Sequence, residues 1–111
     1  MIAVLAALSA AIAIGASAFG AHGASNPQAA EWLRTGGIYQ LIHAVAAFAL
    51  PSLPGGRGPI VTLLVGSLIF AVTLYAMALG APRWFGPITP IGGALMIAGW
   101  LWVALRFVTK S

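Results

Sequence analysis

A small set of polar side chains interrupts segments that are otherwise apolar. Tyr39, Gln40 and His43 are three or four residues apart, so they share one face of a helix. His22 ends the preceding apolar segment, and the short connection after it brings that end level with the first turns of the next helix. Polar groups in a membrane are costly and face the protein interior or water. We therefore expect one polar pocket between the first three helices, made from His22, Tyr39, Gln40, His43, Ser67 and Tyr75.

Two functions of different kinds fit such a pocket. Histidine titrates near neutral pH and could relay a proton, so the pocket could bind or move a small amphipathic molecule or a lipid. The alternative is a structural or accessory protein, in which the same groups only hydrogen-bond between helices and hold the bundle together. A hydrated or ligand-filled cavity that touches His22 and His43 favours the first function. Dry, mutually bonded side chains favour the second.

Other site chemistry finds little support in the sequence. Two histidines and Glu31 do not form a known zinc-ligand spacing, so we expect no metal. With one acidic residue and no nucleophile elbow, the chain offers no recognisable catalytic constellation, and we expect no enzyme. The chain has no cysteine, which excludes disulfides, thiolate metal sites and haem-attachment motifs. We expect no cofactor.

The elements that must position these side chains are four long apolar stretches. Hydrophobic residues make up 61% of the 111-residue chain and charged residues 5%, whereas a soluble domain has about 25% charged residues. A bilayer core about 30 Å thick is crossed by about 20 apolar residues in a helix. The second stretch reaches this length only when it includes Trp32 and Leu33. We predict an all-α integral membrane four-helix bundle with short loops, a single transmembrane domain over residues 1–111, with helices at about 2–21, 28–50, 60–80 and 89–107.

Local signals mark the ends of these helices. Asn26 suits the N-cap of the second helix and Pro27 suits its first turn. Thr89 and Pro90 repeat this pair at the start of the fourth helix. The proline- and glycine-rich residues 51–59 form a turn by composition. Near the other end of the fourth helix, Trp100 and Trp102 are expected at the membrane interface.

The charges are few and scattered. The net charge is +4, from Arg34, Arg57, Arg83, Arg106 and Lys110 against Glu31. The basic residues lie singly in loops or at helix ends, which favours anchoring at lipid headgroups and argues against nucleic acid as a partner. With an even number of crossings, both termini share one side with Arg57, Arg106 and Lys110. The positive-inside rule therefore predicts that both termini lie in the cytoplasm.

Small residues recur at the spacing that lets helices approach closely in a membrane. The first helix has two stripes, Ala7-Ala11-Gly15 and Ser9-Ala13-Ser17-Ala21, so we expect it to be the most enclosed helix. The fourth helix adds a small face made of Gly92, Gly93, Ala94, Ala98 and Gly99. This is more small-residue surface than one bundle needs, and identical chains usually assemble with closed rotational symmetry. We predict a homo-oligomer, a dimer or a trimer, with membrane lipids as the other partners.

A combination of short motifs, in order along nearly the whole chain, is similar to a known family. The motifs are Phe19-Gly20-Ala21-His22-Gly23, Tyr39-Gln40 with His43-Ala44, Gly66-Ser67 with Phe70 and Leu74-Tyr75, and Ile88-Thr89-Pro90-Ile91-Gly92-Gly93 with Gly99-Trp100. The chain resembles the YgdD-like family of small bacterial four-helix membrane proteins, a domain of unknown function with an animal relative. The resemblance implies a multi-pass protein of the bacterial inner membrane with no established activity. Its motif residues map onto His22, Tyr39, Gln40, His43, Ser67, Tyr75, Thr89, Pro90 and Gly92. The chain departs from the family in the short loop after His22-Gly23, which carries few charges.

Overall fold

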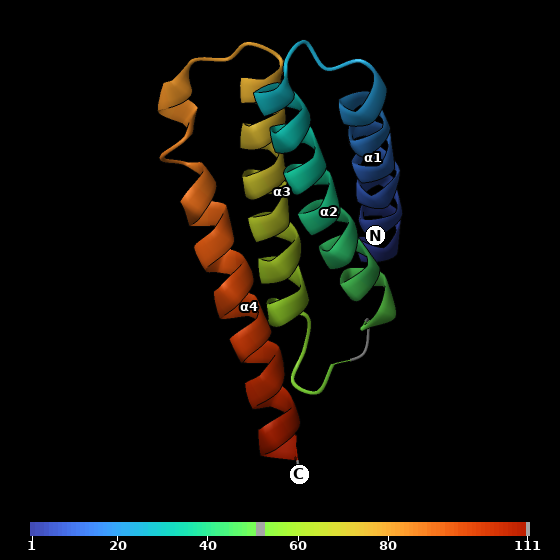
Figure 1. Cartoon of the computed structure of the whole chain (residues 1–111). Coiled ribbons are helices and arrows are strands. Elements are labelled where there is room, and N and C mark those ends of the chain that lie inside the picture. Colours follow the sequence, from blue (N-terminus) through green and yellow to red (C-terminus); the bar gives the residue numbers. More distant parts are fainter. Residues whose placement is uncertain (51–52, 111) are drawn as a thin grey trace.

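The computed structural model describes residues 1–50 and 53–110, which fold into four long helices in antiparallel succession (Figure 1). The long helices are α1 (Ile2–His22), α2 (Pro27–Ala49), α3 (Gly58–Ala78) and α4 (Thr89–Lys110), with a short 3₁₀ helix, η1 (Arg83–Phe85), before α4. Every predicted helix bound lies within about three residues of the observed one. The all-α prediction is confirmed, and the described residues contain no strand.

Three of the segments are long and apolar enough to cross a membrane: Ile2–His22, Gly58–Ala78 and Arg83–Thr109. The helix α2 is as long as these but less apolar, because it carries Glu31, Arg34, Gln40 and His43. It lies between α1 and α3 and runs in the opposite direction (Figure 1), so it crosses with them. The predicted membrane four-helix bundle is therefore confirmed, with both termini at the same end as the α2–α3 connection.

The helices pack mainly with their neighbours in sequence. The helix α2 packs against α1 and α3, and α3 packs against α4, so α1 and α4 lie at the two edges (Figure 1). Half of the α3 span is buried, whereas only 17% of the α1 span is. The expectation that the first helix is the most enclosed is therefore wrong. Small residues mark close helix contacts, but α1 makes such a contact on one side only, with α2.

Glycines set the two closest helix approaches. A Cβ added to Gly92 on α4 would lie 2.6 Å from the carbonyl oxygen of Gly66 on α3, so the two backbones touch. On the α1–α2 side, a Cβ on Gly37 would overlap the Ser17 hydroxyl. A Cβ on Gly99 would meet Leu63 of α3 at 2.7 Å. Part of the small face that was expected to drive assembly through α4 is thus already covered by α3 within the same chain.

The predicted helix starts are also observed. The Asn26 side chain accepts a hydrogen bond of 2.8 Å from the backbone N–H of Ala29, and Pro27 is the first residue of α2. The helix α4 begins at Thr89, followed by Pro90. The Asn26 cap saturates a backbone donor that has no partner within α2, so it fixes where this helix begins, whereas the Thr89 hydroxyl bonds to Thr73.

Candidate functional site

The side chain of Gln40 is at the centre of the polar residues. It is almost completely buried on α2, where only 1% of its surface is exposed. Its Nε2 donates a hydrogen bond of 3.0 Å to the Ser9 hydroxyl on α1, and its Oε1 accepts one of 2.6 Å from the Tyr75 hydroxyl on α3. The Gln40 amide therefore joins three helices. Its hydrogen-bond partners show which end of the amide is the nitrogen and which is the oxygen.

His43, one turn further along α2, connects to the fourth helix. Its Nε2 accepts a hydrogen bond of 3.0 Å from the indole N–H of Trp100 on α4. Because an indole nitrogen can only donate, Nε2 carries no proton. The proton is then on Nδ1, which donates to the backbone carbonyl of Tyr39 at 2.6 Å. The imidazole is therefore neutral and both of its nitrogens are engaged.

A pair of threonines links α3 to α4 nearer the other end. The hydroxyls of Thr73 and Thr89 lie 2.7 Å apart, and Thr73 also bonds to the carbonyl of Ile69 at 2.8 Å. Together with the contacts of Gln40 and His43, this pair ties all four helices by side-chain hydrogen bonds. Among the residues that the structure describes, no buried side-chain nitrogen or oxygen lacks a partner.

Of the six predicted pocket residues, some take part in hydrogen bonds between helices and others do not. Gln40, His43 and Tyr75 are in the hydrogen-bonded groups just described. The Tyr39 ring packs edge-on against Phe70, with ring centroids 5.0 Å apart, and 44% of this residue is exposed. Ser67 is fully buried, but its hydroxyl donates to the carbonyl of Leu64 in its own helix at 2.9 Å.

His22 lies apart from the others. It is the exposed last residue of α1, whereas Gln40 bonds to Ser9 on the same helix. A separation of thirteen positions in sequence spans about 20 Å along a helix axis. The two histidines therefore do not meet in one site. As predicted, His22 lies level with the start of α2. Gln40 and His43 lie several helical turns further along α2.

Two residues of the network were missed from the sequence. Ser9 was read only as one member of a small-residue stripe, although it is a polar residue in an alanine-rich helix. Trp100 was considered only as an interfacial residue, and its bond to His43 was not foreseen; its ring centroid lies 5.8 Å from the imidazole. Further along α4, the Arg106 guanidinium lies 5.3 Å from the ring centroid of Trp102 and also donates to the Pro54 carbonyl.

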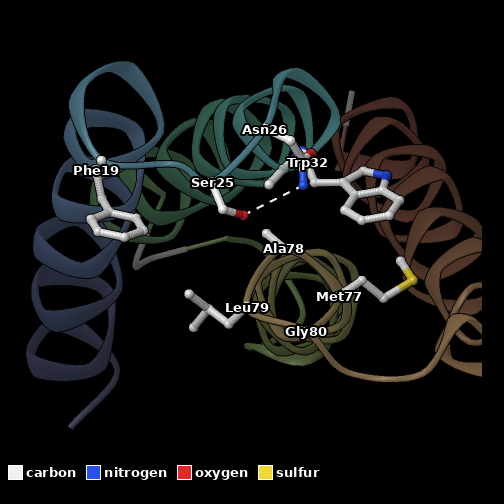
Figure 2. A pocket seen from close by; sticks show the side chains of 10 residues that line it. Phe19, Ser25, Asn26, Trp32, Met77, Ala78, Leu79 and Gly80 are labelled. Atoms are coloured by element: carbon white, nitrogen blue, oxygen red, sulfur yellow. Dashed lines mark hydrogen bonds between the residues drawn. The ribbon is translucent and has the colours of Figure 1, made fainter.

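A cavity of about 340 Å³ opens at the end of the bundle where α1, α2 and α3 meet (Figure 2). Its apolar wall comes from Phe19, Trp32 and Met77, and Ser25 and Asn26 supply polar groups from the α1–α2 loop. The Asn26 amide donates to the Ser25 hydroxyl at 3.4 Å. None of the six predicted pocket residues lines this cavity.

Comparison with known proteins places this arrangement in a family. Residues 16–93 match a family model described as "Protein of unknown function (DUF423)". The chain belongs to the DUF423 family. A UPF0382 membrane protein of Staphylococcus saprophyticus is 37% identical over 110 residues, covering 92% of each chain. One of Haemophilus influenzae is 38% identical, covering 96% of this chain and 94% of the relative. The UPF0382 inner membrane protein YgdD of Escherichia coli is 35% identical, covering 87% and 81%. No solved structure matches.

Membership of the DUF423 family confirms the resemblance to YgdD-like proteins and the coarse description of the chain. It is a multi-pass inner-membrane protein from a family without an assigned function. The matched residues 16–93 include Gln40, His43 and Tyr75 but neither Ser9 nor Trp100. The hydrogen-bond partners at the two edges of the network therefore lie outside the segment that the family model describes.

Proposed function

We propose that this protein is a structural or accessory membrane protein that assembles with a second copy of itself through the outer face of α1. The observation that carries the proposal is the stripe Ala7-Ala11-Gly15, which the rest of the described chain leaves uncovered. A Cβ added to Gly15 would meet no atom within 4 Å. The parallel stripe containing Ala13 and Ser17 packs on Gly37 of α2. The chain thus uses close approach of small residues internally and leaves one such surface open.

The polar network supports the structural half of the proposal. Its side chains are bonded to one another across helices, with Ser9, Gln40 and His43 buried, and this arrangement favours a bundle-holding role over a binding pocket. Both nitrogens of His43 and both ends of the Gln40 amide have protein partners. A catalytic role would have to break these bonds first, so the proposal includes no enzymatic activity.

The shape of the α1 surface fits a helix of a second copy. A shallow apolar groove of about 490 Å³ runs between α1 and α2, and Ala7, Ala11, Ala44 and Phe48 line it. In a dimer whose twofold axis is normal to the membrane, the two copies of α1 would run side by side in parallel. Small residues would then face small residues, which is the main attraction available between helices in lipid.

Cysteine cross-linking tests the proposal cleanly, because the natural chain has no cysteine. Under mild oxidation in membranes, Ala11→Cys should form a disulfide-linked dimer. Val72→Cys on α3, which is 55% exposed, is the matched control and should stay monomeric. Equal cross-linking of the two variants would mean random collision. A monomer in native mass spectrometry from nanodiscs at every protein concentration would refute assembly, whether as a dimer or a trimer.

Binding of a small amphipathic molecule or lipid is the second candidate function. The cavity in Figure 2 favours it, since apolar walls and a polar loop meet there at the end of the bundle. The site would then lie beside His22 and away from Gln40 and His43. Ala29, which lines the cavity and is 2% exposed, offers the test. Ala29→Leu should abolish lipid retention in detergent if this cavity holds the molecule, and unchanged retention would exclude it.

A further inference from the structure

The arginines of this protein outnumber the carboxylates that could pair with them. Glu31 is the only acidic side chain, and its Oε2 lies 3.1 Å from Nη2 of Arg34. Arg83 on η1 is exposed, and among the described residues it donates only to the neutral Oε1 of Gln28, at 3.3 Å. A guanidinium has five N–H donors. Most donors of Arg83 therefore remain available to an anion that the chain itself does not supply.

Arg83 is one of the residues that line a largely apolar cavity. This cavity, about 390 Å³, lies between α2, α3 and the start of α4, with Leu74 and Met77 of α3 and Pro90 of α4 among its walls. Trp32 forms the side on α2. Figure 2 shows the Trp32 indole directed toward α4, with its nitrogen at the far end of the ring. Tryptophan and arginine together are typical of the depth at which lipid headgroups lie.

Deeper in the bundle, α2 and α4 flank α3, and we call the line between these two helices the seam. These two helices have little backbone contact with each other. Phe70 of α3 forms the floor, with Tyr39 against one side and Gly93 on the other, where an added Cβ would meet only Phe70, at 4.0 Å. The bond between His43 and Trp100 closes the seam. From Thr89 to Trp100 it is about 16 Å long, roughly half of the 30 Å hydrocarbon core and thus the depth of one leaflet.

We propose that this seam binds one phospholipid, with the lipid phosphate on Arg83 and an acyl chain lying between α2 and α4. Guanidinium groups bind phosphate oxygens through paired hydrogen bonds. An anionic headgroup such as phosphatidylglycerol is preferred, because the only acidic side chain already pairs with Arg34 and no acidic side chain is left beside Arg83 to receive a headgroup ammonium. The site lies across the bundle from the α1 stripe, so it exists whether or not the protein assembles through α1.

Native mass spectrometry from nanodiscs of equal phosphatidylglycerol and phosphatidylcholine tests the site. The natural protein should retain one phosphatidylglycerol. Arg83→Gln should lower its retention about tenfold or more, which corresponds to about 1.4 kcal/mol. Arg57→Gln makes the same charge change at the opposite end of the bundle and should retain the lipid. Gly93→Leu fills the seam without changing the charge and should also lower retention.

Three results would overturn the inference. Equal losses in Arg83→Gln and Arg57→Gln would show attraction by net charge alone. Equal retention of phosphatidylcholine by the natural protein would remove the headgroup preference. Displacement of the lipid by soluble glycerol phosphate would make the site one for a free anion. Arg83 and Gly93 lie at the surface or beside open space, so a thermal melt of each variant should stay close to that of the natural protein.

Discussion

Replacing Gln40 with leucine should destabilise the bundle more than any other single change in the polar network. The substitution keeps an apolar side chain of similar length but removes two interhelical hydrogen bonds, to Ser9 at 3.0 Å and from Tyr75 at 2.6 Å. Such bonds in a membrane protein are worth about 0.6 kcal/mol on average and about 1.7 at most. Two such bonds together correspond to a loss of about 1–3 kcal/mol in the free energy of unfolding. The loss arises because Ser9 is left without this donor and Tyr75 without this acceptor inside the bundle.

The assay is reversible unfolding in mixed micelles, with Gln40→Leu, Tyr75→Phe and the double variant compared. Since Tyr75→Phe removes one of the same bonds, the double variant should lose less than the sum of the two single losses, by about 0.5 kcal/mol or more. Ser67→Ala is the matched control, because that hydroxyl bonds only within its own helix. Strict additivity, or a Gln40→Leu loss no larger than that of Ser67→Ala, would refute the bridging role of the amide.

Three further predictions concern other parts of the fold. His43→Ala should lower stability by about 0.6–2 kcal/mol and His22→Ala by less, because water can replace a partner only at the exposed end; detergent melts in the reverse order would contradict the network. Gly92→Leu should prevent α3 and α4 from packing and lower the melting temperature sharply, whereas Gly15→Leu should leave the melt unchanged and weaken only assembly. A reporter active only in the cytoplasm should work when fused at the C-terminus, and an active periplasmic reporter there would reverse the topology.

Helix placement could be predicted from the sequence because its causes are local. Hydropathy decides which residues can lie in lipid, and Asn26 with Pro27 decides where α2 begins, with no knowledge of distant contacts. The shared face of Gln40 and His43 follows from helical spacing in the same way. These signals also identified the two α2 side chains at the centre of the network before their partners were known.

The hydrogen-bond partners of Gln40 and His43 could not be predicted, because they depend on the axial offset between neighbouring helices. Gln40 meets Ser9, 31 residues away, and His43 meets Trp100, 57 residues away. Trp100 was not predicted as the partner of His43, because the sequence does not show which turn of α4 lies level with which turn of α2. Small-residue stripes are ambiguous for a similar reason. They show that a helix can be approached closely, but not whether the approaching helix belongs to the same chain.

The neutral state of His43 bears on where function can lie. Protonating Nε2 would set two donors, the indole N–H of Trp100 and the new N–H, against each other at 3.0 Å, so the α2–α4 bond would have to open. A proton relay through the interior would therefore loosen the contact that closes the seam between these helices. Because the interior side chains are hydrogen-bonded to one another, both proposed binding surfaces lie on the outside of the bundle. They are the α1 stripe, proposed to take a helix of a second copy, and the seam beside Arg83, proposed to take a phospholipid.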